Sequence, residues 1–363
     1  MRVIFSLIVF LHGIIHLMGF FKAFALFELK DLTLQISKTI GILWLITALL
    51  LLMFLLLYFV KNKYKNYFAI TGSILSQILI ISAWHDAKFG TLLNIVIFSH
   101  GILGLIANNF ENKISMELDN ILNENNKFKR VIVTKEMIKP LPSPVQLWLT
   151  NSGVIDKEEM SVVHLKQVGK MKLKHHQKKW SDSYSEQYIT TKSPAFFWSV
   201  NMQTIPFLDI KGRDLFKYGK GSMLIKIASA IPVVNVSNEP KLNQSTMQRF
   251  LLEMLWYPTM ALSKYLTWDC IDNVTAKATM LYKGVEGSAT YHFDSNGDLK
   301  KVSALRFRET TENSTPIECI GEVKSHFVID GYKIPNKIEV SWMLDSGKFT
   351  WFKVEIVDVR VNP

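Results

Sequence analysis

The chain has 363 residues, enough for two domains; 48% of them are hydrophobic, and the formal net charge is +11 at pH 7. The positive charge is diffuse, and no Arg-rich helix, zinc-binding or RNA-binding signature accompanies it. This argues against nucleic acid as a partner and favours an anionic membrane surface. Two cysteines, Cys270 and Cys319, are too few for a disulfide framework.

Four long apolar segments predict membrane spans in the first third of the chain. Residues 3–21 can cross a hydrocarbon core of about 30 Å, and no cleavage site typical of a signal peptide follows them. The other three segments are 40–60, 67–84 and 92–107. We therefore expect a multi-pass protein of the cell membrane, with a four-helix transmembrane domain over residues 1–108.

Lysines in a short loop predict the orientation of these spans. The loop between the second and third segments carries Lys61, Lys63 and Lys65, and loops rich in Lys or Arg remain in the cytoplasm. An even number of spans then returns the rest of the chain to the same side. We expect the soluble domain to face the cytoplasm.

Ionisable side chains interrupt the apolar segments. His12 and His16 share one helix face, and we expect His100, in the antiparallel fourth span, at the depth of His12. An ionisable group inside a bilayer is costly unless it has a partner, so these residues form a candidate site. The predicted intramembrane polar site comprises His12, His16, His85, Asp86, Lys88, Asn94 and His100.

Three interpretations of this site are open. His12, His16 and His100 could bind a haem iron or a divalent metal, because neutral imidazole is a common metal ligand. The polar residues could instead relay protons or bind a polar substrate. They could also only hydrogen-bond one another and fasten the helices. Apart from these histidines, we expect no cofactor.

The second part of the chain predicts an α+β domain over residues 136–363, preceded by a polar linker over 109–135. A short helix ending at Gly153 opens the domain. From Asp156 onward, apolar and polar residues alternate as in strands with one wet face, and turns such as Asp330-Gly predict hairpins. About ten antiparallel strands are expected.

One long helix is expected over residues 243–272, among these strands. Ser245 and Gln248 have the spacing of a capping box, and apolar residues follow at helical spacing. Pro258 should end or kink the helix. We predict a strongly curved antiparallel sheet wrapped around this helix, as a half barrel.

The aromatic content of the domain predicts either a large ordinary core or an apolar cavity for a lipid, an acyl chain or a hydrophobic peptide. Arg249 and Glu253 lie four apart and could form a buried ion pair. Glu186 and Glu253 would be the acid and base of an enzyme, but no nucleophile accompanies them, so a binding protein is favoured. The predicted ligand-binding residues are Glu186, Gln187, Trp198, Asp214, Arg249, Glu253, Trp256 and Arg306.

Several motifs resemble those of a family of uncharacterised bacterial multi-span membrane proteins defined by a C-terminal domain of unknown function. They include HGIIHLMGFFKAF, WHDAKFGTLLN, PLPSPVQLWLTNSGV and QRFLLEMLWYPTMAL. One departure is His85, where a small or acidic residue is expected before the Asp. The resemblance implies the two-part architecture and no activity. At fold level, the expected sheet is similar to lipoprotein-carrier domains, which is an analogy.

Three functions remain open. The first is a membrane-anchored module that binds a lipid-like or hydrophobic ligand at the membrane surface, with Arg249, Glu253 and Arg306 at its polar head. The second is a membrane enzyme or transporter centred on the intramembrane histidines. The third is a scaffold without a ligand.

Overall fold

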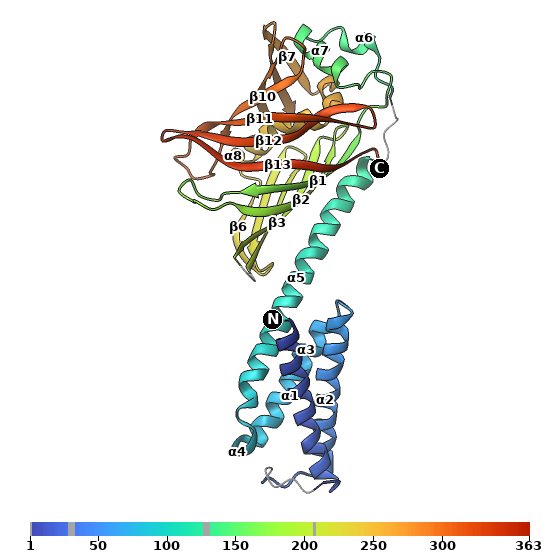
Figure 1. The fold of residues 1–363 in the computed structure, drawn as a ribbon, viewed down its shortest axis with the longest axis vertical. Coiled ribbons are helices and arrows are strands. Elements are labelled where there is room, and N and C mark those ends of the chain that lie inside the picture. Colours follow the sequence, from blue (N-terminus) through green and yellow to red (C-terminus); the bar gives the residue numbers. More distant parts are fainter. Residues whose placement is uncertain (1, 28–32, 126–130, 206–207) are drawn as a thin grey trace. The chain divides into compact units, whose positions relative to one another are not determined.

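The computed structural model describes residues 2–27, 33–125, 131–205 and 208–363. They form two compact units, Met1–Asn112 and Lys113–Pro363. The first unit contains the helices α1 (Arg2–Ala23), α2 (Lys38–Phe59), α3 (Lys65–Ser82), α4 (Trp84–Ala87) and the first part of α5 (Gly90–Asn125). The end of α5 belongs to the second unit (Figure 1).

Apolar helices dominate the first unit. Among the described residues, α1, α2 and α5 are long and apolar enough to cross a membrane, which supports a membrane protein. The predicted count of four spans is not confirmed, because α3 is less apolar and carries buried polar residues such as Asn66 and Ser76. Small residues allow close packing, as at Gly19, where an added side-chain carbon would lie 2.3 Å from the ring of Trp44.

The described part of the second unit contains one open antiparallel sheet of 13 strands in the order β6-β5-β4-β3-β2-β1-β13-β12-β11-β10-β9-β8-β7. The strands are β1 (Val162–Met171), β2 (Ser181–Thr190), β3 (Ala195–Ile205), β4 (Leu208–Lys217), β5 (Lys220–Ile227), β6 (Ile231–Ser237), β7 (Leu266–Asp272), β8 (Thr275–Tyr282), β9 (Val285–Phe293), β10 (Leu299–Phe307), β11 (Pro316–Ile329), β12 (Tyr332–Leu344) and β13 (Gly347–Val361). Short helices α6 (Lys135–Ile138) and α7 (Ser143–Asn151) precede them.

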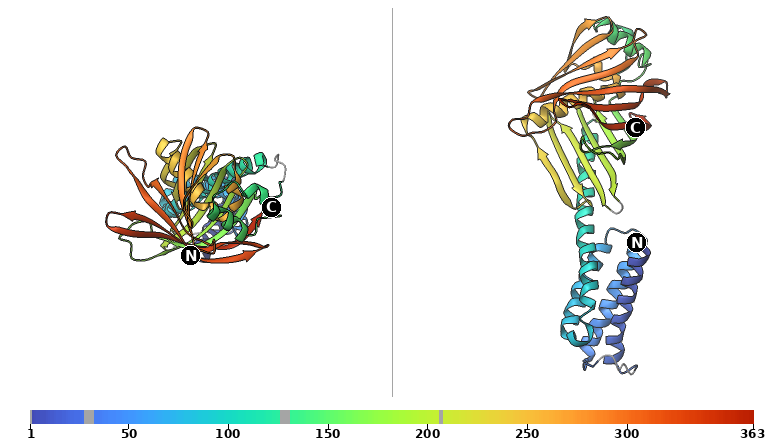
Figure 2. Two further views of the ribbon diagram at one scale, coloured as in Figure 1. Left: turned by 90° about the horizontal axis from the view of Figure 1, so that it is seen from above. Right: turned by 60° about the vertical axis from the view of Figure 1, so that its left-hand side comes forward.

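The curved sheet wraps around helix α8 (Pro240–Leu252), which leads from one edge strand to the other (Figure 2). Two short 3₁₀ segments, η1 (Glu253–Trp256) and η2 (Pro258–Leu262), complete this connection. Met247, Phe250 and Leu251 are fully buried between α8 and the sheet. The hydroxyl of Tyr291 donates to the carbonyl of Leu251 at 2.5 Å, which satisfies a carbonyl at the end of the helix. The core therefore lies on the concave side of the sheet.

The prediction of a long helix over 243–272 was wrong at both ends. Helix α8 begins at Pro240, and Ser245 is an interior residue whose hydroxyl donates to the carbonyl of Phe307 at 2.7 Å, so no capping box forms. After Leu252 the chain tightens into η1 and η2, and residues 266–272 form the edge strand β7. The expected curved sheet and the hairpin at Asp330-Gly are present.

Much of the segment predicted as a polar linker is helical. Helix α5 continues to Asn125, and its last turns pack on the face of the sheet opposite α8, where Ile121 and Phe197 are buried. Arg213 on β4 is almost completely buried, and its Nε lies 2.9 Å from the Glu117 carboxylate on α5. The polar residues of this segment therefore include anchors of the helix on the sheet.

Candidate functional site

A cavity of about 560 Å³ lies on the concave side of the sheet, under α8. Strands from both halves of the sheet line it, together with α8 and η1. Its wall is mostly apolar and rich in aromatic rings, which include Phe196, Trp198, Trp256, Trp342, Phe349, Trp351 and Phe352. A few charged side chains, Arg249 and Arg306 among them, interrupt this apolar wall.

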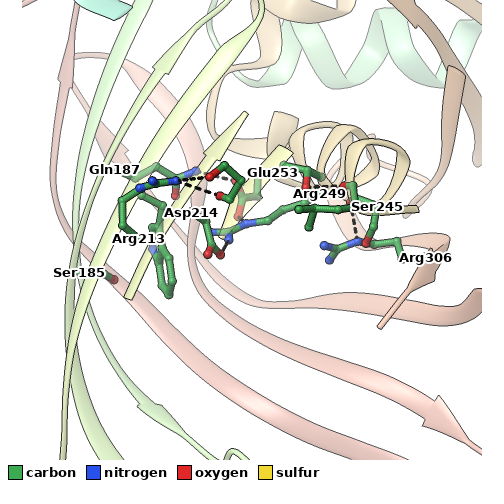
Figure 3. A network of polar contacts seen from close by, with 12 residues as sticks. Ser185, Gln187, Arg213, Asp214, Ser245, Arg249, Glu253 and Arg306 are labelled. Carbon is green, nitrogen blue, oxygen red and sulfur yellow. Dashed lines mark hydrogen bonds and ion pairs between the residues drawn. The ribbon is translucent and has the colours of Figure 1, made fainter. Parts of the chain in front are cut away.

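Arg249 on α8 is the centre of a cluster of charges in this cavity (Figure 3). Its Nη1 donates to Oδ2 of Asp214 on β4 at 2.5 Å, and its Nε donates to Oε1 of Glu253 at 2.7 Å. The guanidinium lies over the ring of Trp198, 4.6 Å from its centroid. Asp214 and Glu253 therefore share one cation, and an aromatic ring covers one of its faces.

Amide side chains continue this network along the sheet. The Nε2 of Gln187 donates to Oε2 of Glu253 at 2.6 Å, and Nε2 of Gln167 donates to Oε1 of Gln187 at 3.0 Å. The Oε1 of Gln167 accepts hydrogen bonds from the Trp198 indole at 3.0 Å and from the Ser185 hydroxyl at 2.8 Å. A connected polar network of this kind holds its members in one arrangement.

Burial and charge act in opposite directions within the cluster. Burial raises the pKa of the Asp214 carboxyl, although the charge of Arg249 opposes that shift. Burial alone would lower the pKa of Arg249, but the carboxylates of Glu253 and Asp214 raise it. The guanidinium of Arg249 therefore stays charged, and both carboxyls are paired with it.

Arg306 on β10 lines the same cavity but belongs to a different set of contacts. Its Nε donates to the carbonyl of Ser245 at 3.0 Å, and Nη1 lies 3.6 Å from Sγ of Cys319 (Figure 3). The guanidinium lies 5.5 Å from the ring centroid of Trp342. Within the described residues Arg306 forms no ion pair.

A second polar cluster lies inside the first unit. His12 Nε2 lies 2.9 Å from Asn94 Oδ1, and the amide of Asn94 donates to Gln77 at 3.0 Å. The amide of Gln77 in turn donates to the hydroxyl of Thr91 at 3.1 Å. The hydroxyl of Ser76 lies 3.3 Å from His12 Nε2. Helices α1, α3 and α5 are thus joined by a continuous chain of hydrogen bonds.

The comparisons with known proteins concern mainly the sheet domain. A model of DUF6920, a family of unknown function, matches residues 139–360, more than half of the chain. The chain belongs to this family. The match confirms the resemblance to a family defined by a C-terminal domain of unknown function. No curated protein sequence matches the chain. Among solved structures, it is similar to a LolA superfamily protein from Nitrosomonas europaea, with 10% identity and a TM-score of 0.36 over 61% of this chain and 94% of that one.

The DUF6920 domain brings most of the predicted ligand-binding residues together. The cavity is lined by Trp198, Asp214, Arg249, Glu253, Trp256 and Arg306. Gln187 donates a hydrogen bond to Glu253. The prediction that Glu186 belongs to the cavity was wrong. It is exposed on the opposite face of β2, because successive residues of a strand point to opposite sides. Glu186 and Glu253 therefore cannot act together as acid and base.

Other residues of the site were not predicted from the sequence. Gln167, Ser185 and Ser245 complete the hydrogen-bond networks, and Lys172 and Arg308 also line the cavity. Alternation along β1 places Gln167 on the same face as Leu165, which is a signal that could have identified it. Lys172 and Arg308 directly follow strands, and no sequence pattern marks such positions.

The DUF6920 protein does not bring the three intramembrane histidines together. His100 packs against Phe5, with ring centroids 4.7 Å apart, whereas His16 packs against His12 at the same centroid distance. Phe5 precedes His12 by seven residues, which corresponds to about 10 Å along the helix. Among the described residues, no group of three or more His, Cys, Asp or Glu could hold a metal ion. The expected common depth of His12 and His100 was wrong.

The remaining predicted residues, His85, Asp86 and Lys88, lie in or next to the short helix α4. Asp86 accepts hydrogen bonds from the backbone N–H of Thr33 at 2.8 Å and of Leu34 at 3.3 Å. Hydrogen bonds from His85 and then from Thr33 lower the pKa of Asp86 to about 2. His85 and Lys88 are exposed. Asp86 therefore fastens the end of the loop between α1 and α2 at Thr33 and Leu34.

Proposed function

We propose that this protein is a membrane-anchored binding protein whose DUF6920 domain takes up a hydrophobic, lipid-like ligand at the membrane surface. The cavity under α8 carries this proposal. Its volume of about 560 Å³ lies within the range of small-molecule sites, about 300–1,000 Å³. Its apolar wall is interrupted by a few convergent polar groups, as in sites that orient an amphipathic ligand.

An ordinary core would not leave this space. Protein interiors are close-packed, and voids much larger than one water molecule are rare. Here the side chains that surround the cavity are held by connected hydrogen bonds, as at Trp198 and Glu253. Trp256 is also fixed, because its indole donates to the carbonyl of Pro335 at 3.1 Å. A rigid wall of this kind resists collapse into the empty volume.

Filling the cavity tests the proposal. Val340 on β12 lines the cavity, whereas Val357 on β13 is exposed and does not line it. Native mass spectrometry of the full-length protein in detergent should show an added mass of a few hundred daltons that fragments as a lipid. We expect Val340→Trp to lose this mass and Val357→Trp, the matched control, to keep it. A bare polypeptide mass for the wild type, or equal retention in Val340→Trp, would contradict the proposal.

The anchor is proposed as four spans, with the DUF6920 domain in the cytoplasm. The support is the cluster of Lys61, Lys63 and Lys65 between α2 and α3, because short loops rich in lysine are retained on the cytoplasmic side. Helix α3 then crosses with its polar residues turned to its neighbours, as its buried Asn66 and Ser76 favour. Labelling of Cys270, described below, tests the side of the membrane.

A second candidate function is supported by the hydrogen-bond chain between His12 and Thr91. His16 is almost completely buried, its Nδ1 donates to the carbonyl of His12 at 2.8 Å, and its Nε2 has no partner among the described residues. Such a chain could conduct protons or bind a polar solute. In proteoliposomes, we expect proton flux that is lost in His12→Ala and kept in His85→Ala. Absent flux in the wild type, or unchanged flux in His12→Ala, would reject this candidate.

A further inference from the structure

Arg306 introduces a positive charge into the cavity and forms no ion pair with a described acidic residue. Its contacts are the carbonyl of Ser245, the thiol of Cys319 and the ring of Trp342. These groups accept hydrogen bonds or lie against the cation, but none of them carries an opposite formal charge. A half-buried guanidinium of this kind gains more from an anion than an exposed one does, because less water surrounds the pair.

The other arginine of the cavity is in the opposite situation. Arg249 is bound by both Asp214 and Glu253, so its charge is more than compensated before any ligand arrives. The sequence had suggested that Arg249, Glu253 and Arg306 would contact one polar head together. An anionic head placed near Arg249 would meet two carboxyls. The geometry instead favours Arg306 as the residue that selects the charge of the ligand.

The rim of the cavity near Arg306 is also basic. Arg308 lies at this rim, with its guanidinium 5.8 Å from the ring centroid of Phe349. Lys172, the residue after β1, lines the same cavity. Glu309 is the acidic residue of the same rim. An approaching anion therefore meets more positive than negative charge, which speeds its capture.

We propose that the ligand is an anionic amphiphile whose carboxylate or phosphate head binds Arg306 and whose apolar chain lies in the cavity against Trp342 and Val340. This rests on the proposed function and assigns the headgroup of that ligand. Guanidinium groups bind carboxylates and phosphates through parallel N–H donors, so both heads share one chemistry. A neutral lipid would cover the half-buried guanidinium of Arg306 without supplying a counter-charge.

Matched probes test the head and the chain separately. Binding of a fluorescent long-chain fatty acid, its methyl ester and the alkyl phosphate of the same chain length is measured on the full-length protein in neutral detergent. We expect the wild type to bind the acid or the phosphate at least about tenfold more tightly than the ester, a factor typical of one charge-assisted contact. The tighter of the two anions identifies the head.

Variants assign this preference to Arg306. Arg306→Gln should lose the preference of about tenfold and bind the ester as the wild type does, whereas Arg306→Lys should keep part of the preference. Arg360→Gln, on the exposed end of β13, is the matched control. Equal wild-type affinity for ester and anions, or a parallel loss of all probes in Arg306→Gln, would overturn the inference. Failure of every probe to bind, with no lipid mass in native spectra, would instead overturn the proposed function.

Discussion

Replacing Arg249 with Met should destabilise the DUF6920 domain strongly. The side chains of Arg249, Asp214 and Glu253 are 14–16% exposed, and loss of the guanidinium leaves two carboxyls facing one another in an apolar cavity. Removing one partner of a buried ion pair costs about 3–5 kcal/mol. Because water still reaches part of these side chains, we expect the lower end, about 3 kcal/mol. In a domain of this size, that lowers the unfolding temperature by about 6–12 °C.

The deficit should depend on pH in a defined direction. Burial already raises the pKa of Asp214 above its value of 3.8 in the unfolded chain, and the variant loses the opposing charge of Arg249. A carboxyl whose folded pKa is raised contributes stability that is fully present below its unfolded pKa and is lost as pH rises through its folded pKa. The deficit of Arg249→Met should therefore be smaller in mildly acidic buffer than above neutral pH.

Thermal unfolding of the full-length protein in detergent, followed by tryptophan fluorescence at about pH 5.5 and about pH 8, measures both effects. Arg360→Met is the matched control, because Arg360 pairs with Asp358 on the surface at 3.4 Å. Exposed ion pairs of that kind contribute about 0–1 kcal/mol. A deficit for Arg249→Met no larger than that of the control, or one that grows in acid, would refute the reasoning.

Three other predictions concern the exposure of single side chains. If the domain faces the cytoplasm, a membrane-impermeant maleimide should label the exposed Cys270 only after cells are lysed, with Cys270→Ser as the control; labelling of intact cells would place the domain outside. Cys319 should stay unlabelled until unfolding, because it is buried and burial raises the pKa of its thiol. Glu186→Gln should change stability by less than about 0.5 kcal/mol and leave any bound lipid mass in native spectra unchanged, since Glu186 points away from the cavity. A loss of that mass would return Glu186 to the site.

Local patterns in the sequence predicted those parts of the site that lie within one element. Arg249 and Glu253 are four residues apart, so their pairing follows from helical geometry alone. The partner Asp214 lies 35 residues away on β4, and no local rule could bring it to Arg249. Alternation along β2 predicts that Glu186 and Gln187 face opposite sides, but only the position of α8 identifies the inner face. The other residues of the site can therefore be identified only from tertiary contacts.

The error over His100 has a similar physical origin. Alignment of the first and fourth spans by their centres places His100 at the depth of His12. The structure aligns them by the turn between α3 and α5: α4 occupies residues 84–87, and α5 begins at Gly90. This start brings Asn94 opposite His12, so His100 lies nearer the beginning of α1, beside Phe5.

Adjacent residues of β4 predict where a soluble fragment of this protein should begin. Asp214 points to α8, and Arg213 points to the opposite face, where Glu117 of α5 holds it while it is almost completely buried. A fragment that starts at residue 131 lacks both Glu117 and the helix that covers Arg213, so it loses this ion pair. It also uncovers the apolar surface around Phe197.

We expect a fragment over 113–363 to unfold at a markedly higher temperature than one over 131–363, and Glu117→Gln in the longer fragment to reproduce part of the difference. Equal unfolding temperatures would show that the end of α5 is dispensable for the sheet.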